Sequence, residues 1–525
     1  MKCEICHERE AGFVLHREKK DGGTEELYVC GACRDNKRGN APSQEFKKTF
    51  HVKLTGSQKK TIENDVNHAF NEIRKLIEEQ FLGGHGDVEA EEPDEPGQAD
   101  EAEQDFEFKG ADPREPSCEA CGMSRAELRR GQRLGCPKCY DAFEHEVSLM
   151  IRDMHKGTKH IEENGGRVSP RADVSPRADA DDVVLTSRVR FARNMGTALF
   201  PGWADQPGRL RVLSAARNAL QKLNPGKGWM PWDKMPGAER RRMEERHWVS
   251  REMVEAPGET GVWMSEDKQV SVLVNEEDHL RIQGIVKGYD LRAAWQLAKG
   301  MDDALGSRLG FAYSEELGYL TACPSNVGSG MRASVMVHLA GLALTGEIDG
   351  AIRGIERMGY AVRGAGGEDS ESAGEVFQIS NAGTLGTPEQ KVLEDLEEVV
   401  DELVRQERWA RQFLREEDPV VAEDCVARAL AAAGAARIMA TPEGMAHLSA
   451  IRLGVAAGIV EGATLETLDE MLVNIQPAHL AHGANDPRIL EEGREILRDM
   501  CRAEFMRAFF KSFHLKIATK RGRVK

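Results

Sequence analysis

The sequence has no apolar run long enough to span a membrane and no secretory signal. We therefore expect a cytoplasmic chain, in a compartment where thiols stay reduced. It also lacks the GxxxxGK[ST] phosphate loop and the HRD and DFG motifs. These absences exclude P-loop nucleotidases and ordinary protein kinases, so any nucleotide site must neutralise phosphate charge in another way.

Basic residues are missing from one part of the chain. Residues 87–107 hold 11 acids and no Lys or Arg, and they carry most of the formal net charge of −17. The surrounding residues 83–116 are rich in Glu, Asp, Pro and Gly and poor in apolar residues, which predicts a disordered linker. The acidic balance disfavours nucleic-acid binding as a main role, while weak binding by the basic pieces stays open.

Few cysteines stand alone. Eight of the eleven form four CxxC pairs, two early in the chain and 23 residues apart, and two later and 14 apart. This spacing is typical of tetrahedral sites with four thiolates, so we predict two structural Zn²⁺ sites, with disulfides as the alternative. The predicted ligands are Cys3, Cys6, Cys30 and Cys33 for the first site and Cys118, Cys121, Cys136 and Cys139 for the second.

Three consecutive acids follow an apolar run. Ser271–Val274 reads as a buried strand, and Glu276, Glu277 and Asp278 come directly after it. Like charges placed together raise one another's pKa, which makes a purely structural role costly. Such acids can orient a cationic substrate, accept a proton or hold magnesium through water. An acidic strand end that faces solvent is the plainer alternative.

Four further segments complete an ordered pattern. They are TSRVR at 186–190, before the acidic stretch, and CPSNVGSGMRAS at 323–334, RGAGGE at 363–368 and QISN at 378–381, after it. Arginine suits a phosphate site without a P-loop, because it is always charged and presents a planar fork to phosphate oxygens. Together the segments resemble the catalytic domain of the guanidino (phosphagen) kinases, and more narrowly the bacterial protein-arginine kinases.

The resemblance implies a fold and a reaction. The fold is α+β, a guanidino-kinase catalytic domain with an antiparallel sheet flanked by helices, preceded by small four-cysteine zinc modules. The reaction is phosphoryl transfer from ATP, with Mg²⁺, to a guanidinium, which is a poor nucleophile because its pKa exceeds about 12. By its place in the motif, Glu277 is the base, Glu276 and Asp278 support magnesium, water or substrate, and Cys323 assists.

The resemblance also implies a nucleotide site and an allosteric site. The residues expected at the nucleotide are Ser187, Arg188, Val189, Arg190, His247, Arg281, Arg332, Ala333, Ser334, Val335, Met336, Arg363, Gly364, Ala365, Gly366, Gly367 and Glu368. The residues expected to bind phosphoarginine, in an RDxxRA motif, are Arg498, Asp499, Arg502 and Ala503. Arg498 and Arg502 are four apart and share one helix face, so they can clamp one dianion; an ordinary charged face is the alternative.

The cysteine-rich region resembles the activator that partners these kinases. The likeness lies in MKCEICH at 1–7, CEACGM at 118–123 and CPKCYDAF at 136–143. The activator's coiled C-terminal segment has no clear counterpart before residue 181. The chain therefore looks like an activator fused to a kinase, with the activator shortened.

These features divide the chain into six parts. We expect a first zinc element plus a helix at 61–81 within 1–82, the linker at 83–116, a second zinc element plus helix at 117–160, and a spacer at 161–180 with a repeated VSPRAD. The catalytic domain spans 181–510 and a basic tail follows at 511–525. Within the catalytic domain, TPEQ at 387–390 predicts a capped helix start.

Three functions compete. The first is a kinase of protein arginines, regulated in cis by the zinc module, whose products by resemblance serve protein quality control or the stress response. Its partners would be proteins with accessible arginines, a Clp-type protease machinery and a stress-gene repressor, with no membrane, no primary nucleic-acid role and a homodimer left open. The second is a small-molecule arginine kinase, disfavoured because no helical domain of roughly a hundred residues precedes TSRVR. The third is a non-catalytic phosphoarginine-binding adaptor, disfavoured by the intact acids and arginines.

Overall fold

The computed structural model describes residues 13–18, 24–29, 117–155, 157–161, 180–224, 228–230, 232–256, 258–364, 373–485, 487–491, 493–512 and 516–517. The chain divides into two units, residues 1–105 and 106–525. In the first unit, β1 (Phe13–Glu18) and β2 (Thr24–Val29) pair as an antiparallel hairpin. The first four predicted zinc ligands and the helix predicted at 61–81 lie outside the described residues.

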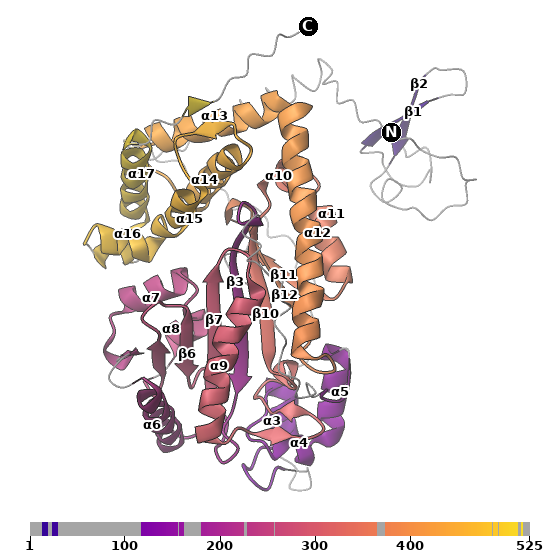
Figure 1. Ribbon diagram of the computed structural model, residues 1–525, viewed down its shortest axis with the longest axis vertical. Coiled ribbons are helices and arrows are strands. Elements are labelled where there is room, and N and C mark those ends of the chain that lie inside the picture. The colour runs from indigo at the N-terminus through magenta and orange to yellow at the C-terminus, as the bar shows by residue number, and fades with distance from the viewer. Residues whose placement is uncertain are drawn as a thin grey trace, which may run out of the picture. The chain divides into compact units, whose positions relative to one another are not determined.

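The second unit is built on an eight-stranded antiparallel sheet (Figure 1). The strands run in the spatial order β11, β12, β10, β3, β7, β6, β5 and β4. Their bounds are β3 Val184–Arg193, β4 Trp229–Met230, β5 Gly261–Met264, β6 Val270–Val274, β7 Leu280–Lys287, β10 Met331–His338, β11 Tyr360–Gly364 and β12 Val376–Asn381. The predicted buried strand before the three acids is β6, and all five of its residues are buried.

Helices cover one face of this sheet. Side chains of α6 (Gln206–Leu223), α9 (Leu291–Leu309) and α12 (Glu389–Glu416) join those of β3, β6, β7 and β10 in the largest apolar core. In Figure 1, α9 lies in front of the sheet, and both α9 and α12 run roughly along the strands. The short helices α10 (Ala340–Leu344) and α11 (Ile348–Arg357) follow β10. The helices α7 (Gly237–Glu245) and α8 (Arg251–Glu255) lie beside β5 and β6.

The start of α12 differs from the prediction. The predicted capping box at 387–390 is absent: Pro388 is the N-cap, no side chain caps it, and the helix begins at Glu389. The carboxylate of Glu389 instead accepts a hydrogen bond from Nε1 of Trp295 on α9, at 2.8 Å. Val392, Leu396 and Leu403 are buried and lie along one side of the helix.

Five helices form the C-terminal part. They are α13 (Pro419–Ala435), α14 (Thr441–Ala456), α15 (Leu465–Asn474), α16 (Pro477–Gly483) and α17 (Glu495–Ser512). The tail predicted from residue 511 carries one short strand, because β14 (Lys516–Ile517) pairs with β13 (Val460–Glu461). No helix among the described residues is both long and apolar enough to cross a membrane.

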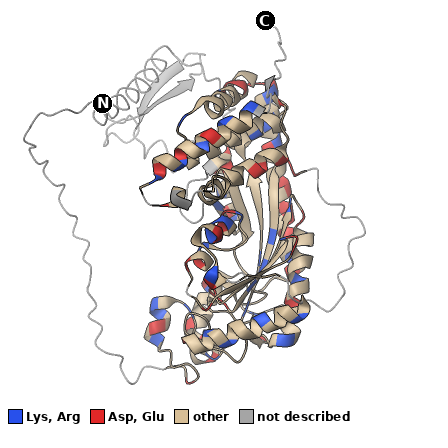
Figure 2. Cartoon of the chain, turned by 90° about the vertical axis from the view of Figure 1, so that its left-hand side faces the viewer, with Lys and Arg blue, Asp and Glu red and all other residues tan. Residues whose placement is uncertain are grey.

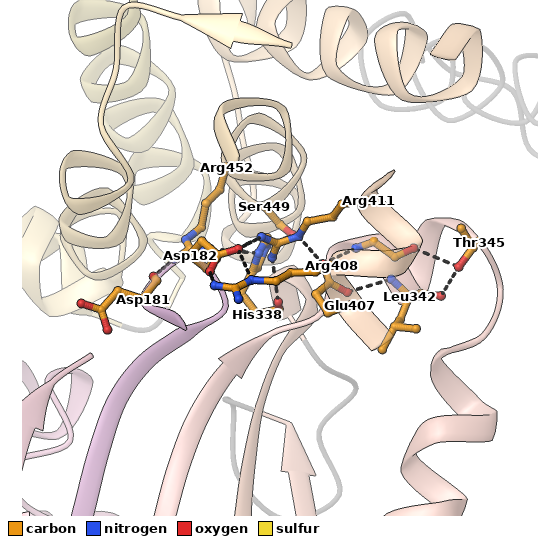
Figure 3. Close-up of polar contacts among 11 residues, drawn as sticks. Asp181, Asp182, His338, Leu342, Thr345, Glu407, Arg408, Arg411, Ser449 and Arg452 are labelled. Carbon is orange, nitrogen blue, oxygen red and sulfur yellow. Dashed lines mark hydrogen bonds and ion pairs between the residues drawn. The ribbon is translucent and has the colours of Figure 1, made fainter. Parts of the chain in front are cut away.

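A buried polar network joins these helices to the sheet (Figure 3). Arg452 of α14 is fully buried and donates to the backbone oxygen of Asp182 at 2.8 Å and to Nδ1 of His338 at 3.2 Å. The carboxylate of Asp182 pairs with Arg408 at 2.6 Å and Arg411 at 3.0 Å, both on α12. Burial and the two arginine charges lower the pKa of His338 well below its usual value, so its ring stays neutral. The network fixes the start of β3.

We predict that Gly284→Ala destabilises the catalytic domain by about 1–3 kcal/mol, the usual cost of overpacking. A Cβ at Gly284 on β7 would lie 2.3 Å from the backbone oxygen of Ala294 on α9, and a backbone atom cannot rotate away. Gly300→Ala on the same helix is the matched control, since its Cβ meets no atom within 4 Å and alanine favours helix. Urea unfolding measures both. Equal midpoints for the two variants would contradict this close contact.

Candidate active site

Arginines from four strands share one face of the sheet. Directly opposite residues of antiparallel strands point to the same side, and β3 pairs with both β10 and β7. Arg190 lies opposite Arg332, and Arg281 lies opposite Ala192, two residues along β3. Arg363 of β11 lies opposite Gln378 of β12, whose side chain accepts a hydrogen bond from Arg188. Figure 2 marks basic residues in blue, including positions on the strands.

Positive charges crowd this face of the sheet. Desolvation lowers the pKa of Arg188 to about 10, with the charges of Arg281 and Arg332 adding to the shift. Desolvation also lowers the pKa of Arg190 well below its usual value, and Arg188 and Arg281 add to this. Arg332 donates to the hydroxyl of Ser380 from Nε at 3.2 Å and from Nη2 at 3.0 Å. An anion on this face would offset the repulsion among these charges.

Four residues predicted at the nucleotide point the other way. The side chains of Val189, Ala333 and Val335 are fully buried in the apolar core under the helices. Ser187 is fully buried too, and its hydroxyl donates to the backbone oxygen of Gly288 at 2.9 Å. Side chains alternate along a strand, so the odd-numbered residues of β3 point to the face away from Arg188 and Arg190. Only the backbone of these four residues can therefore line the arginine face.

The rest of the predicted nucleotide set is divided. Ser334 and Met336 alternate with the buried residues of β10 and lie on the arginine side, where Arg188 contacts the Ser334 hydroxyl at 3.4 Å. His247 follows α7 in a left-handed conformation, φ +57°, and its backbone oxygen accepts from Gln283 at 3.4 Å. Arg363 and Gly364 end β11. The predicted residues Ala365, Gly366, Gly367 and Glu368 lie outside the described residues.

The three acids occupy the turn between β6 and β7. Asn275 adopts a left-handed conformation, φ +59°, and its N–H donates to the backbone oxygen of His279 at 3.0 Å, which closes the turn. Glu276 accepts from Nη1 of Arg281 at 2.6 Å and from the hydroxyl of Ser250. The turn therefore sets the acids at the edge of the arginine face, with Arg281 between them and the rest of the cluster.

Asp278 is buried, unlike the partly exposed Glu277. It was expected to support magnesium, water or substrate, but its side chain is buried and accepts hydrogen bonds from Nδ2 of Asn194 and from the N–H of Ala322, the latter at 2.7 Å. Desolvation, followed by the charge of Glu277, raises its pKa to about 7. Asp278 thus links Ala322, just before Cys323, to Asn194, just after β3.

Glu277 is the most accessible of the three acids. Its side chain is 19% exposed, compared with 2% for Glu276. Its Oε2 lies 3.8 Å from Nη2 of Arg281 and 3.4 Å from Nδ2 of Asn326. Asn326 belongs to the short 3₁₀ turn η3 (Pro324–Asn326), directly after Cys323. The structure thus brings Glu277, Arg281 and the Cys323 loop together, and the thiol of Cys323 contacts the Ser325 hydroxyl at 3.0 Å.

The second zinc element forms a compact thiol cluster. The sulfurs of its four cysteines lie within 4.8 Å of one another, with 3.6 Å between Cys118 and Cys136 and 3.4 Å between Cys121 and Cys139. Four thiolates on one Zn²⁺ at about 2.3 Å stand about 3.8 Å apart, so the cluster fits a tetrahedral zinc ion. These separations are too long for disulfides, which excludes the alternative reading at this site.

This element packs directly on the Cys323 loop. It comprises α3 (Arg125–Gly131), α4 (Cys139–Ala142) and α5 (Glu144–Met154). The hydroxyl of Tyr140 donates to the backbone oxygen of Thr321 at 2.9 Å, and Nε2 of His155 contacts the backbone oxygen of Pro324 at 2.8 Å. Side chains of this element and of residues 312–327 share one apolar core. The spacing of the cysteines in the sequence could not have predicted that this element packs on the Cys323 loop.

The predicted phosphoarginine residues lie on α17, which contacts α13, α14 and α16. Arg502 is fully buried; its Nη1 donates to the backbone oxygen of Met439 at 2.7 Å and pairs with Asp499 at 2.6 Å, and its Nε donates to Ile475 at 2.9 Å. Its Nη2 is buried with no hydrogen-bond partner among the described residues. Ala503 is buried and Arg498 is half-buried, so the two arginines are not equivalent surface charges.

Three family models match the chain. Residues 211–410 match the ATP:guanido phosphotransferase C-terminal catalytic domain, residues 419–521 the protein-arginine kinase McsB C-terminal domain, and residues 116–161 the McsA central zinc-finger domain. The protein-arginine kinase of Symbiobacterium thermophilum is 40% identical over 333 residues, which is 62% of this chain and 93% of that protein. The one from Halothermothrix orenii is 38% identical over 330 residues, 62% of this chain and 92% of that protein.

The chain belongs to the protein-arginine kinase family. The predicted guanidino-kinase fold, the kinase class, the use of ATP and the zinc-binding activator-like element are thereby confirmed. A solved structure of the duplicated taurocyamine kinase from Schistosoma mansoni, with bound transition state analog components, aligns with a TM-score of 0.49 at 25% identity. That alignment covers 54% of this chain and 41% of that chain.

We predict that Cys118→Ser or Cys136→Ser removes the zinc of the second element and lowers kinase turnover by up to about 10²-fold. Small thiolate sites fold on binding metal, and loss of this one would release the loop that carries Cys323, where small misplacements are costly. Metal analysis and initial rates on a protein substrate measure both effects. Cys425→Ser, at a half-buried cysteine of α13, is the matched control. Full activity after zinc loss would refute the link.

Asp278 predicts a pH-dependent stability. A carboxyl whose pKa rises from 3.8 to about 7 on folding binds its proton more tightly in the folded kinase, so its stabilising contribution disappears as the pH rises through about 7. Asp278→Asn keeps Oδ1 as an acceptor and removes this titration. The melting temperature of the wild type minus that of the variant should fall steadily as the pH rises from 3.8 to about 7. Asp233→Asn, at an exposed position, controls for the loss of one acid, and a pH-independent difference would contradict the assignment.

Proposed function

We propose that the chain transfers the γ-phosphoryl group of ATP to arginine side chains of protein substrates. The proposal rests on two neighbouring features. Several arginines share one face of the sheet, and at the edge of this face Arg281 lies beside the partly exposed carboxylate of Glu277. The arginine face suits a polyanion, and the carboxylate suits a cationic acceptor. A site with both is suited to moving a phosphoryl group from nucleotide to guanidinium.

The steps follow from this arrangement. Arg188, Arg190, Arg281 and Arg332 bind phosphate oxygens through their planar forks and offset charge as the bond to ADP breaks. Glu277 aligns one guanidinium nitrogen of the acceptor and takes its proton while that nitrogen attacks the γ-phosphorus. The transition state is loose, so positioning and charge stabilisation supply most of the rate enhancement. Cys323, on the loop beside Glu277, assists on the acceptor side.

The acids near the turn do not form a magnesium cage of their own. Glu276 already pairs with Arg281, and Asp278 is buried with two hydrogen-bond donors. Magnesium supplies charge neutralisation to nucleotide phosphates, usually keeps several waters and relies on few carboxylates. We therefore assign no ligand role to Asp278, and propose that the ion is held mainly by the nucleotide that brings it.

A protein acceptor fits better than free arginine. A zinc element, and not a helical substrate domain, precedes the catalytic region and packs beside the Cys323 loop. Among the described residues from 117 to 180, no helical domain is present that could enclose a small guanidino compound. Incubation with ATP and either an arginine-rich protein or free arginine, followed by mass spectrometry for acid-labile phosphate, distinguishes the two. Phosphate on free arginine alone would favour the small-molecule kinase.

We further propose the biological setting on the strength of the family resemblance. The chain acts in the cytoplasm, and its products mark proteins for a Clp-type protease machinery or switch a stress-gene repressor. The zinc element regulates the kinase in cis, and a homodimer is compatible with this role. Catalytic residues 181–510 and zinc elements within 1–82 and 117–160 form the proposed domains, with residues 83–116 as linker.

The C-terminal helix is proposed to bind phosphoarginine. The unpaired, buried Nη2 of Arg502 can supply one donor to a phosphate, and half-buried Arg498, one turn earlier on α17, can supply another. Asp499 holds the first guanidinium in place, and Ala503 leaves room beside it. Because Arg502 also binds two backbone oxygens, Arg498 is the position at which binding can be weakened without loosening the helix contacts.

We predict that Glu277→Gln lowers turnover by about 10²–10⁴-fold and leaves ATP affinity unchanged. The glutamine keeps the shape of the side chain but cannot take the proton, and general-base contributions are of this size. Initial rates on a protein acceptor and separate nucleotide titrations measure both quantities. Glu417→Gln, exposed just after α12, is the matched control. Near-normal turnover would rule out Glu277 as the base.

A further inference from the structure

A guanidinium from the second zinc element already contacts Glu277. Arg133 lies between α3 and α4, and its Nη2 is 3.1 Å from Oε1 of Glu277. We propose that Arg133 is an internal occupant of the acceptor position, which an arginine of a substrate protein must displace. This proposal rests on the proposed function, because it assigns to Glu277 the guanidinium that is to be phosphorylated.

The two oxygens of Glu277 face different partners. Arg281, which belongs to the arginine face, and Asn326, which belongs to the Cys323 loop, both contact Oε2. Arg133 contacts Oε1. One oxygen is therefore held from the phosphate side, and the other is offered to a guanidinium that enters from the zinc element. Loss of Arg133 would leave the contacts of Oε2 with Arg281 and Asn326 in place.

Hydrogen bonds hold the backbone beside Arg133, whereas the Arg133 side chain is largely exposed to solvent. The N–H of Leu134 donates to the backbone oxygen of Ala322 at 2.8 Å, and the N–H of Phe200 donates to that of Gly135 at 2.9 Å. Leu134 is buried in the core shared with the catalytic domain. The side chain of Arg133, by contrast, is 65% exposed. A short tether gives the guanidinium a high effective concentration at Glu277, and its exposed ion pair is weak enough to be displaced.

Such an occupant has a distinct kinetic signature. It competes with the acceptor arginine for Oε1, and it leaves the arginines that face the nucleotide untouched. Removing it should lower the acceptor concentration needed for half-maximal rate and should change neither kcat nor the KM for ATP. A residue that instead positioned the base would lower kcat when removed.

Arg133→Ala is the test variant, and Arg129→Ala is its matched control. Arg129 lies on α3 of the same element, is 63% exposed, and pairs with Glu146 at 3.6 Å instead of with Glu277. Both changes remove one positive charge from the same element. Equal zinc content and melting temperature in the full-length proteins establish that the variants fold alike.

The measurement is the initial rate at saturating ATP against a peptide with a single arginine among serines and glycines. We expect the peptide KM of Arg133→Ala to fall about two- to fivefold, in keeping with a weak exposed ion pair, with kcat unchanged and Arg129→Ala like the wild type. Calorimetric titration of the same peptide without nucleotide should show a matching gain in affinity for Arg133→Ala alone.

Several results would overturn the proposal. An unchanged or higher peptide KM, or a lower kcat, in Arg133→Ala would make Arg133 a positioning residue or a bystander. An equal effect in Arg129→Ala would reduce the contact to general charge repulsion. If no variant, the wild type included, phosphorylated any acceptor, the proposed function would fail, and the calorimetric comparison would still decide whether Arg133 occupies the guanidinium position.

Discussion

Several arginines on one face of a sheet repel one another, and much of this structure offsets that repulsion. Like charges directly opposite each other on neighbouring strands destabilise a sheet, yet Arg190 lies opposite Arg332. Desolvation adds to the cost, as the lowered pKa values of Arg188 and Arg190 show. The opposite face offsets it, because alternate residues of the same strands bury an apolar layer under α6, α9 and α12. A strand thus divides its residues between stability and function.

The same charge imbalance explains the order of the acidic turn. Glu276 is drawn to Arg281 and is almost fully buried, so it neutralises the near end of the cluster. Asp278 points into the protein and, with a raised pKa, carries a proton at or below about pH 7. Glu277 alone keeps one oxygen turned away from the arginine face. The three consecutive acids therefore have three different environments. The direction in which the backbone points each side chain decides which environment each acid has.

Sequence motifs could predict which residues meet, because the arginine and acidic motifs carry the family's spacing. They could not predict which way each side chain points. Val189 and Ala333 belong to the same motifs as Arg188 and Arg332 but are buried on the other face. The burial of Asp278 and Arg502 depends on donors and acceptors more than 25 residues away, such as Ala322 for the first and Ile475 for the second. Such tertiary partners leave no local pattern, and the same is true of Trp295, whose indole donates to the carboxylate of Glu389.

The zinc element and the Cys323 loop share one apolar core, and this core couples zinc binding to the position of the loop. Cys118, Cys136 and Cys139 pack among the same apolar side chains as Leu320 and Ala322, which flank the loop. Because metal binding and folding of such a cluster are one equilibrium, the free energy of zinc binding also stabilises the loop. The hydrogen bonds from Tyr140 and His155 then fix its backbone beside Glu277. An element that resembles a separate activator is thus packed directly against the loop that carries Cys323, so a change in its folding can reach this loop without a rearrangement of two domains.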